Sequence, residues 1–369
     1  MICRQYFLIV IFSLVSFNVI GQKRLMENQA ILEEIKICLA STYSFRFDEA
    51  KDALAPIENY SPNHPVVQFI RAFIIYWENY PLTPGHPKEA DFLKNMEDCI
   101  KISEDWYKRA PDELEAIFFD MFSRAFYVMY WSDNGKPAKV FPHLNILYHH
   151  TLQGFDLKEK FNEFYFTTGL YNYYVQAYPE KHPVYKPVVM LFREGDREKG
   201  KEQLAYCAEN SVFLRVEARF FLSLLHLNYE SDLETASLHA AELYREFPDN
   251  SYYAGKYLEI LLFNKKFFFA PVILEKMKGW HDDFSQMQYF LYHAYYLEKC
   301  EKDLESAKKE YKKALELSEH FGDFTMPYNA VAYMGLARYY QWKGNASLSN
   351  RFFRQAKMAT SYAYILEDR

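Results

Sequence analysis

The stretch SDLETASLHAAELYREFPDN, residues 231–250, decides the fold. Small and apolar residues recur in it every three or four positions, which is the period of one helix face. Ala236 is followed four and seven positions later by the packing residues Ala240 and Leu243, and Pro248 interrupts the pattern. This stretch predicts an amphipathic helix that packs closely against a neighbour.

The same unit recurs through the C-terminal half of the chain, in residues 195–211, 264–277, 301–317 and 344–359. Its small anchor residues are Gly200, Ala236, Ala270, Ala307 and Ser349, with spacings of 36, 34, 37 and 42 residues. A repeat of this length predicts stacked helical units, because one helix hairpin cannot bury its apolar face alone.

These units resemble the tetratricopeptide-repeat family, whose pattern is W-x₂-L-G-x₂-Y…A-x₃-F…P with a period of about 34 residues. In 217–250 the first helix carries Phe220, Ser223, Leu224 and Leu227, and in the last unit Tyr333, Leu336, Ala337 and Tyr340 precede Ser349, Phe353 and Ala356. Near the N-terminus Cys38, Ala50, Leu54, Ile57 and Pro62 fall in the same register. The resemblance implies an all-α fold, a right-handed α-solenoid of about eight stacked antiparallel helix pairs.

The repeats divide residues 22–369 into three parts of one solenoid. Residues 22–130 carry degenerate repeats, 131–195 depart from the repeat length and suggest an irregular helical segment, and 196–369 carry the clearer repeats. Turn signals such as SPNHP (61–65) and YPEKHP (178–183) separate the expected helices.

Residues 1–21 have the features of a secretory signal peptide. Arg4 precedes an apolar run, and Val19 and Gly21 occupy the −3 and −1 positions of a cleavage site. An uncleaved anchor is the alternative, but Tyr6–Ile20 is shorter than the ~20 residues that a spanning helix needs. The ending VIGQ resembles secretory signals common in Bacteroidetes-type bacteria, which implies an exported protein of the periplasm or peripheral outer membrane of a Gram-negative bacterium.

The composition excludes several classes of protein. The 369 residues include 43 Lys+Arg, 49 Asp+Glu and only 12 Gly, and 50% are hydrophobic. A disordered chain and a turn-rich β protein are therefore excluded, and the acidic balance makes nucleic acid an unexpected partner. The mature chain keeps Cys38, Cys99, Cys207 and Cys300, for which buried free thiols are favoured over one long-range disulfide.

No signature of catalysis, cofactor binding or metal binding stands out. His143, His149 and His150 cluster, but no H-E-x-x-H motif or carboxylate run completes a metal site. The chain has no G-x-S-x-G, no phosphate-binding glycine motif and no recognisable catalytic cysteine. We expect a non-enzymatic protein with no cofactor. The alternative is an enzyme that uses two catalytic carboxylates far apart in the sequence, as glycosidases do.

The family resemblance assigns certain positions of the first helix of each repeat to a concave groove. Phe221 and Leu225 stand where chaperone-binding members carry polar residues of a carboxylate clamp, so capture of a chaperone tail is not implied. The expected groove is largely aromatic with a few polar groups, which suits an extended peptide or a partner helix. Its predicted partner-binding residues are Phe221, Leu225, Tyr229, Tyr252, Phe263, Tyr295, Arg338 and Trp342.

The expected function is a protein–protein interaction scaffold of the cell envelope. A glycan-binding helical-repeat protein and a self-assembling envelope subunit are the alternatives, and a homo-oligomer is possible with either. Phe267, Phe268 and Phe269 form an aromatic run in which the last two fall where the pattern is usually solvated. Packing of this run on residues 278–285 is favoured over an exposed contact patch.

Overall fold

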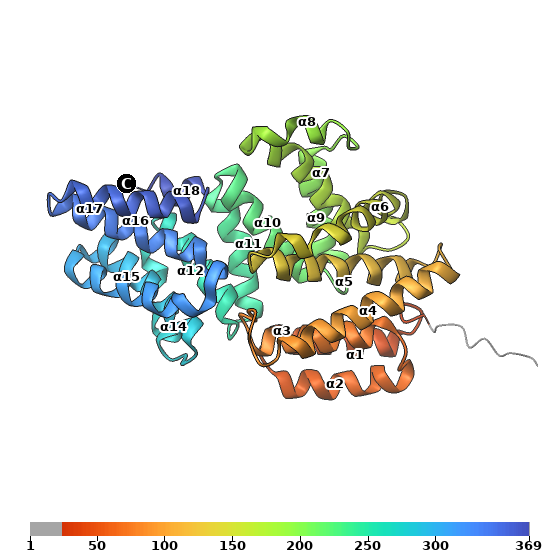
Figure 1. The fold of residues 1–369 in the computed structure, drawn as a ribbon. Helices are drawn as coiled ribbons and strands as arrows, with labels where there is room; N and C mark the ends of the chain where they lie inside the picture. The colour runs from red at the N-terminus through yellow and green to blue at the C-terminus, as the bar shows by residue number, and fades with distance from the viewer. Residues whose placement is uncertain (1–23, 369) are drawn as a thin grey trace, which may run out of the picture.

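The computed structural model describes residues 24–368, which are helical along most of their length and include no strand (Figure 1). The predicted signal peptide, residues 1–21, and Cys3 lie outside the described residues. Within them, consecutive helices pack as eight neighbouring pairs. The predicted all-α solenoid of stacked helix pairs is confirmed.

The pairs follow one another along the chain, and each forms from helices that are close in sequence. They are α1 (Gln29–Tyr43) with α2 (Phe47–Tyr60), α3 (Pro65–Glu78) with α4 (Glu89–Arg109), α5 (Leu114–Asp133) with α6 (Phe141–Leu157), α7 (Phe164–Lys181) with α9 (Arg197–Asn210), α10 (Arg215–Leu225) with α11 (Leu233–Glu246), α12 (Ser251–Phe263) with α13 (Ala270–Lys278), α14 (Asp283–Tyr296) with α15 (Leu304–Ser318), and α16 (Met326–Trp342) with α17 (Ala346–Ala359).

Short elements join or extend these pairs. They are the one-turn helices α8 (Lys186–Val189) and α18 (Ala363–Leu366), the 3-10 turns η1 (Pro137–Lys139), η2 (Pro183–Tyr185), η4 (Phe267–Phe269) and η6 (Glu319–Thr325), and the π turns η3 (His226–Glu230) and η5 (Leu297–Glu301). Residues 131–195 thus contain two ordinary helices, α6 and α7, and the irregular backbone is confined to the turns around them.

Acidic and amide side chains fix where many helices begin. Asp232 accepts a hydrogen bond from the backbone N–H of Thr235 at the start of α11, and Asn345 accepts one from Leu348 at the start of α17. Such caps satisfy backbone donors that have no partner inside the helix and stabilise it by about 1 kcal/mol each. Single polar residues at the N-cap positions therefore define where these helices begin.

Small residues mark the places where paired helices cross. Ser223 on α10 donates a hydrogen bond to the Ala236 carbonyl of α11 over 2.9 Å, and the Cys38 thiol contacts the Ala50 carbonyl of α2 at 3.1 Å. A Cβ atom on Gly200 of α9 would lie 2.7 Å from the backbone nitrogen of Tyr173 on α7. Close approach of backbones is possible only because these positions carry little or no side chain.

The solenoid has two lobes, and it folds back so that they touch. The N-terminal lobe (residues 24–210, α1–α9) and the C-terminal lobe (residues 251–368, α12–α18) flank α10 and α11 (Figure 1). Tyr43 at the end of α1 packs its ring 5.3 Å from that of Phe247 and 6.2 Å from that of Tyr253. One hydrophobic core therefore runs from α1 to the start of α12.

Two expectations about individual side chains are wrong. Phe268 and Phe269 are 88% and 52% exposed, because η4 turns them outward at the start of α13, whereas only Phe267 packs inward against Tyr296. Cys38, Cys99 and Cys207 are buried free thiols as expected, but Cys300 is exposed because η5 lies at the surface.

The helices were also compared with the requirements of a membrane span. Among residues 24–368, no helix is both long enough and apolar enough to cross a bilayer.

Candidate partner-binding face

The predicted groove residues differ greatly in how much surface they present. Leu225 and Tyr295 are 0% and 3% exposed, so neither side chain reaches a partner in this conformation. Trp342 lies at the opposite extreme, with 56% of its surface exposed and the Lys343 ammonium 4.1 Å from its ring centroid. Tyr229 and Tyr252 are half-buried.

The other three predicted residues are half-buried in separate contacts. Phe221 packs edge-on against Phe166 of α7 at 5.4 Å between ring centroids. Phe263 packs against Tyr295 at 4.8 Å. Arg338 pairs with Glu298, its Nε lying 2.5 Å from Oε1. The structure therefore does not bring all eight residues into one continuous surface.

Four half-buried tyrosines lie within electrostatic reach of one another, because the Tyr362 hydroxyl acts on each of the other three. We call them the inner tyrosine cluster: Tyr174 of α7, Tyr229 of η3, Tyr252 of α12 and Tyr362 beside α18. The Tyr174 and Tyr229 rings are 5.4 Å apart. Burial, followed by the neighbouring Tyr362 hydroxyl, raises the pKa of Tyr229 to about 12. Burial also raises the pKa of Tyr252, with smaller effects from Asp133, Glu259 and Tyr362.

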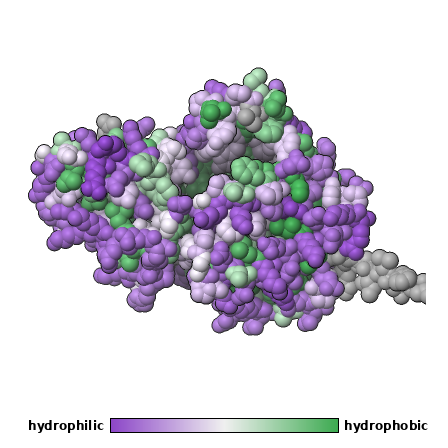
Figure 2. Space-filling model, in the orientation of Figure 1, coloured by the Kyte–Doolittle hydropathy of each residue, from purple (hydrophilic) through white to green (hydrophobic). Residues whose placement is uncertain are grey.

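Asp133, at the end of α5, faces this cluster in an unusual environment. Its side chain is open to solvent, yet burial among the surrounding helices raises the pKa of its carboxyl to about 6. Figure 2 shows a hollow between the lobes, lined by white to green atoms, whereas the outer surfaces are mostly purple.

Glu259 supplies a second carboxylate to the inner face. It is 4% exposed and accepts hydrogen bonds from the hydroxyl of Tyr364 at 2.7 Å and that of Tyr292 at 3.2 Å. The Lys256 ammonium lies 2.5 Å from its Oε2. Because three donors surround it, this buried carboxylate is compensated and positions the tyrosines around it.

The last described residues return to this inner face, which the sequence pattern did not reveal. We call Thr360–Asp368 the C-terminal segment; it leaves α17 and contains α18. Within it, Tyr364 packs edge-on against Phe263 at 5.0 Å, and Asp368 contacts Arg338. The only sequence signal is an aromatic and acidic stretch, SYAYILED, beyond the final repeat.

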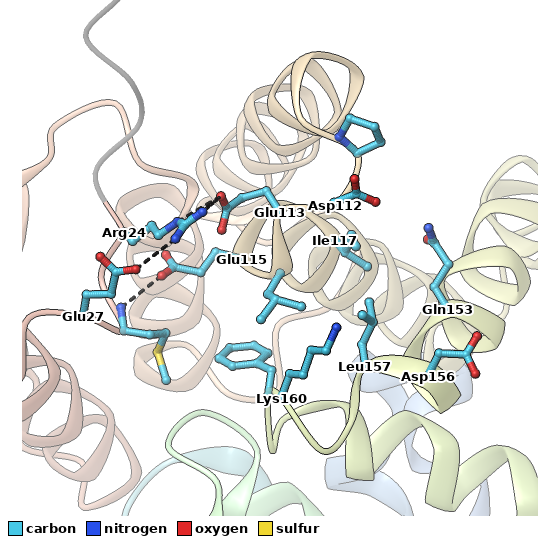
Figure 3. A pocket seen from close by; sticks show the side chains of 14 residues that line it. Arg24, Glu27, Asp112, Glu113, Glu115, Ile117, Gln153, Asp156, Leu157 and Lys160 are labelled. Atoms are coloured by element: carbon cyan, nitrogen blue, oxygen red, sulfur yellow. Dashed lines mark hydrogen bonds and ion pairs between the residues drawn. The ribbon is translucent and has the colours of Figure 1, made fainter.

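A separate pocket of about 610 Å³ lies at the start of α5 (Figure 3). Its floor is apolar, with Ile117 and Leu157 among the residues that line it, and its rim carries more acidic than basic side chains. Arg24 at the rim is already paired, with hydrogen bonds of 2.8 and 3.0 Å to Glu113. Arg24 therefore compensates part of the negative charge at the rim of this pocket.

Glu115 of α5 also lines this pocket, and its carboxylate holds the first described residues against α5 by hydrogen bonds. It accepts hydrogen bonds from the backbone N–H groups of Leu25 and Met26 and from His64 Nε2, at 2.9 to 3.1 Å. His64 accepts the Val66 N–H at its Nδ1, so its proton sits on Nε2. Burial lowers the pKa of His64, which favours this neutral form. The arrangement is structural, since the Glu115 carboxylate oxygens and both ring nitrogens of His64 form hydrogen bonds within the protein.

The three clustered histidines lie in different environments. His150 is buried, with Nε2 2.8 Å from Asp120 Oδ2, whereas His149 is exposed. His143 lies 3.4 Å from Arg124 Nη1. In the part of the chain that the structure describes, no three His, Cys, Asp or Glu side chains gather as a metal-binding group.

Comparisons with known proteins add little to this geometry. No family model matches the sequence, and no curated protein matches it either. Among solved structures, the crystal structure of yeast Tom70 aligns with 92% of this chain and 93% of its own, at 12% sequence identity and a TM-score of 0.24.

Proposed function

We propose that this protein is a non-enzymatic scaffold that binds a protein partner, as an extended peptide or a single helix, on its inner face. The observation that supports this most is the inner tyrosine cluster, to which both lobes contribute side chains. Tyrosines combine apolar area with a hydrogen-bonding hydroxyl and lose little entropy on binding, so they are enriched at interfaces.

The charges around the cluster favour a peptide over a purely apolar ligand. Asp133 supplies an exposed carboxylate, and the Lys181 ammonium lies 4.8 Å from the centroid of the Tyr229 ring. Both signs of charge are thus present within one concave face. Backbone amides and mixed side chains of an extended peptide match such a surface.

We place this scaffold in the cell envelope, exported by residues 1–21 and either periplasmic or held at the outer membrane by its partner. Cell fractionation with N-terminal sequencing of the mature chain tests this placement. A mature chain that begins at Gln22 in the envelope fraction is the expected result. Recovery of the full chain in the cytosol would contradict it.

The binding function is tested by crosslinking in cells followed by a pull-down of the tagged chain. We expect Tyr229→Ala to lose a protein that the wild type captures. Tyr206→Ala is the matched control, because Tyr206 is a 43% exposed tyrosine that packs on Tyr165 of α7, away from the cluster. Identical captured proteins for all three folded chains would refute the inner face as the binding site.

A further inference from the structure

The C-terminal segment rests on the inner face through an apolar contact and a polar contact. At one end Ile365 is 1% exposed, and Tyr364 fits between Phe263 and Glu259. At the other end Asp368 meets two cations: Lys299 Nζ lies 2.9 Å from Oδ1, and Arg338 Nη1 lies 3.1 Å from Oδ2. The aspartate stands four positions after the tyrosine.

The polar contact is sheltered from solvent. The side chains of Asp368, Arg338 and Lys299 are 18%, 12% and 20% exposed. Arg338 Nη1 also donates a hydrogen bond of 2.6 Å to the Asp368 backbone carbonyl. Removing one partner from such a sheltered group costs more than it does in an exposed pair, because the remaining charges lose their compensation.

The segment also covers residues that the repeat pattern assigned to partner binding. Phe263 contacts Tyr364, and Arg338 contacts Asp368. Burial, together with the Asp368 carboxylate, raises the pKa of Tyr295. Three of the eight predicted groove residues therefore face the chain's own C-terminal segment.

The C-terminal segment has little backbone structure of its own. Thr360 is extended, so α17 ends before the segment begins, and α18 is a single turn from Ala363 to Leu366. One turn of helix is not stable by itself, so its order depends on the contacts described above. Short segments with few contacts open at low free-energy cost.

We propose that the C-terminal segment is an internal competitor, and that its site takes a partner peptide of the same chemistry. That peptide carries a tyrosine whose hydroxyl reaches Glu259, an aliphatic residue after it, and a carboxylate four positions after the tyrosine that reaches Arg338 and Lys299. Partner binding displaces the segment. This inference rests on the proposed function and deepens it by naming the partner class and its regulation.

The test uses a fluorescein-labelled peptide, SYAYILEDR, equal to residues 361–369, and full-length chains in fluorescence anisotropy. Wild type should bind it weakly, because the tethered segment has a millimolar effective concentration. Asp368→Asn in the protein removes the segment's carboxylate from Lys299 and Arg338 and should tighten peptide binding roughly fivefold or more. Glu367→Gln removes the same charge from an exposed neighbour and should behave as wild type.

The chemistry of the site is tested on the Asp368→Asn protein. Adding Arg338→Gln to it should weaken peptide binding, as should Tyr364→Ala or Asp368→Asn within the peptide. Equal binding by wild type and Asp368→Asn, or by peptides with and without the tyrosine, would overturn the inference. Dimers in sedimentation that the free peptide dissociates would overturn it in favour of a second copy as the occupant. The proposed function is tested separately, by whether Tyr229→Ala loses the protein that the wild type captures in the pull-down.

Discussion

Asn250 donates a hydrogen bond from Nδ2 to the backbone carbonyl of Tyr43, over 3.0 Å and across 207 residues of sequence. Its Oδ1 at the same time caps α12 by accepting from the N–H groups of Tyr252 and Tyr253. One fully buried amide thus joins the first helix pair to the sixth.

Asn250→Ala should therefore lower the free energy of unfolding by about 2–4 kcal/mol, since it removes a helix cap and leaves a buried carbonyl without its donor. Asn345→Ala is the control, because Asn345 caps α17 at an exposed site, and it should cost only about 1 kcal/mol. Urea unfolding of both variants measures the difference. Equal losses would show that the long-range bond contributes nothing.

Gly200→Ala tests the close crossing of α7 and α9. Alanine in a helix normally stabilises by up to about 1 kcal/mol over glycine. Here the added Cβ would lie 2.7 Å from Tyr173 N and 2.8 Å from the Gly169 carbonyl, so we expect a loss of about 1–3 kcal/mol. Gly154→Ala in α6 meets nothing closer than 3.4 Å and should be neutral or stabilising. Thermal melts that show the same sign for both would contradict the crossing geometry.

Ionisation of the buried Glu217 carboxyl should lower the free energy of unfolding as pH rises. Burial raises the pKa of its carboxyl to about 7, and it accepts a hydrogen bond from the Tyr43 hydroxyl through one oxygen. A raised pKa means that the folded state favours the protonated acid, so this stability is present below pH 4.5 and is lost as pH approaches 7. Glu217→Gln should be more stable than wild type at pH 8 by about 1–3 kcal/mol.

Unfolding free energies measured between pH 5 and 8 check the prediction for Glu217. The slope with pH should be smaller in Glu217→Gln than in wild type. Glu209→Gln, at an exposed position on the preceding helix, should keep the wild-type slope. If Glu217→Gln also kept it, the carboxyl would be ionised in the folded protein.

Glu115→Gln should loosen the attachment of the first described residues. An amide group cannot accept from all three of the Leu25, Met26 and His64 donors, so we expect a loss of about 2–3 kcal/mol. Glu113→Gln, which weakens only the pair with Arg24, should cost less than about 1 kcal/mol. Limited proteolysis near residue 28 should speed up in Glu115→Gln alone. Unchanged proteolysis would contradict the anchoring role.

The helix pairs could be predicted because their signal is local. Ala236, Ala270 and Ala307 are 0 to 2% exposed, as small residues at helix crossings should be. Spacing alone located them, since the requirement for a small residue recurs in each repeat. The exposure of Phe268 and Phe269 could not be predicted in the same way, because it depends on the direction in which η4 leaves α12.

The candidate site could be predicted only in part. Tyr229 and Tyr252 are half-buried and keep some exposed surface, whereas Tyr295 is covered. What covers it depends on contacts between distant residues, such as the hydrogen bond between Tyr364 and Glu259, 105 positions apart. No periodic pattern carries information about such a contact, and the C-terminal segment lies outside the repeats.

The most direct test of this account is hydrogen–deuterium exchange of residues 360–368 in the full-length chain. The amides of Ile365, Leu366 and Glu367 donate to carbonyls of Tyr362 and Ala363, so they are expected to exchange slowly in wild type. In Asp368→Asn they should exchange about tenfold faster, because the segment opens more often. Exchange in wild type at the rate of an unstructured peptide would contradict the account.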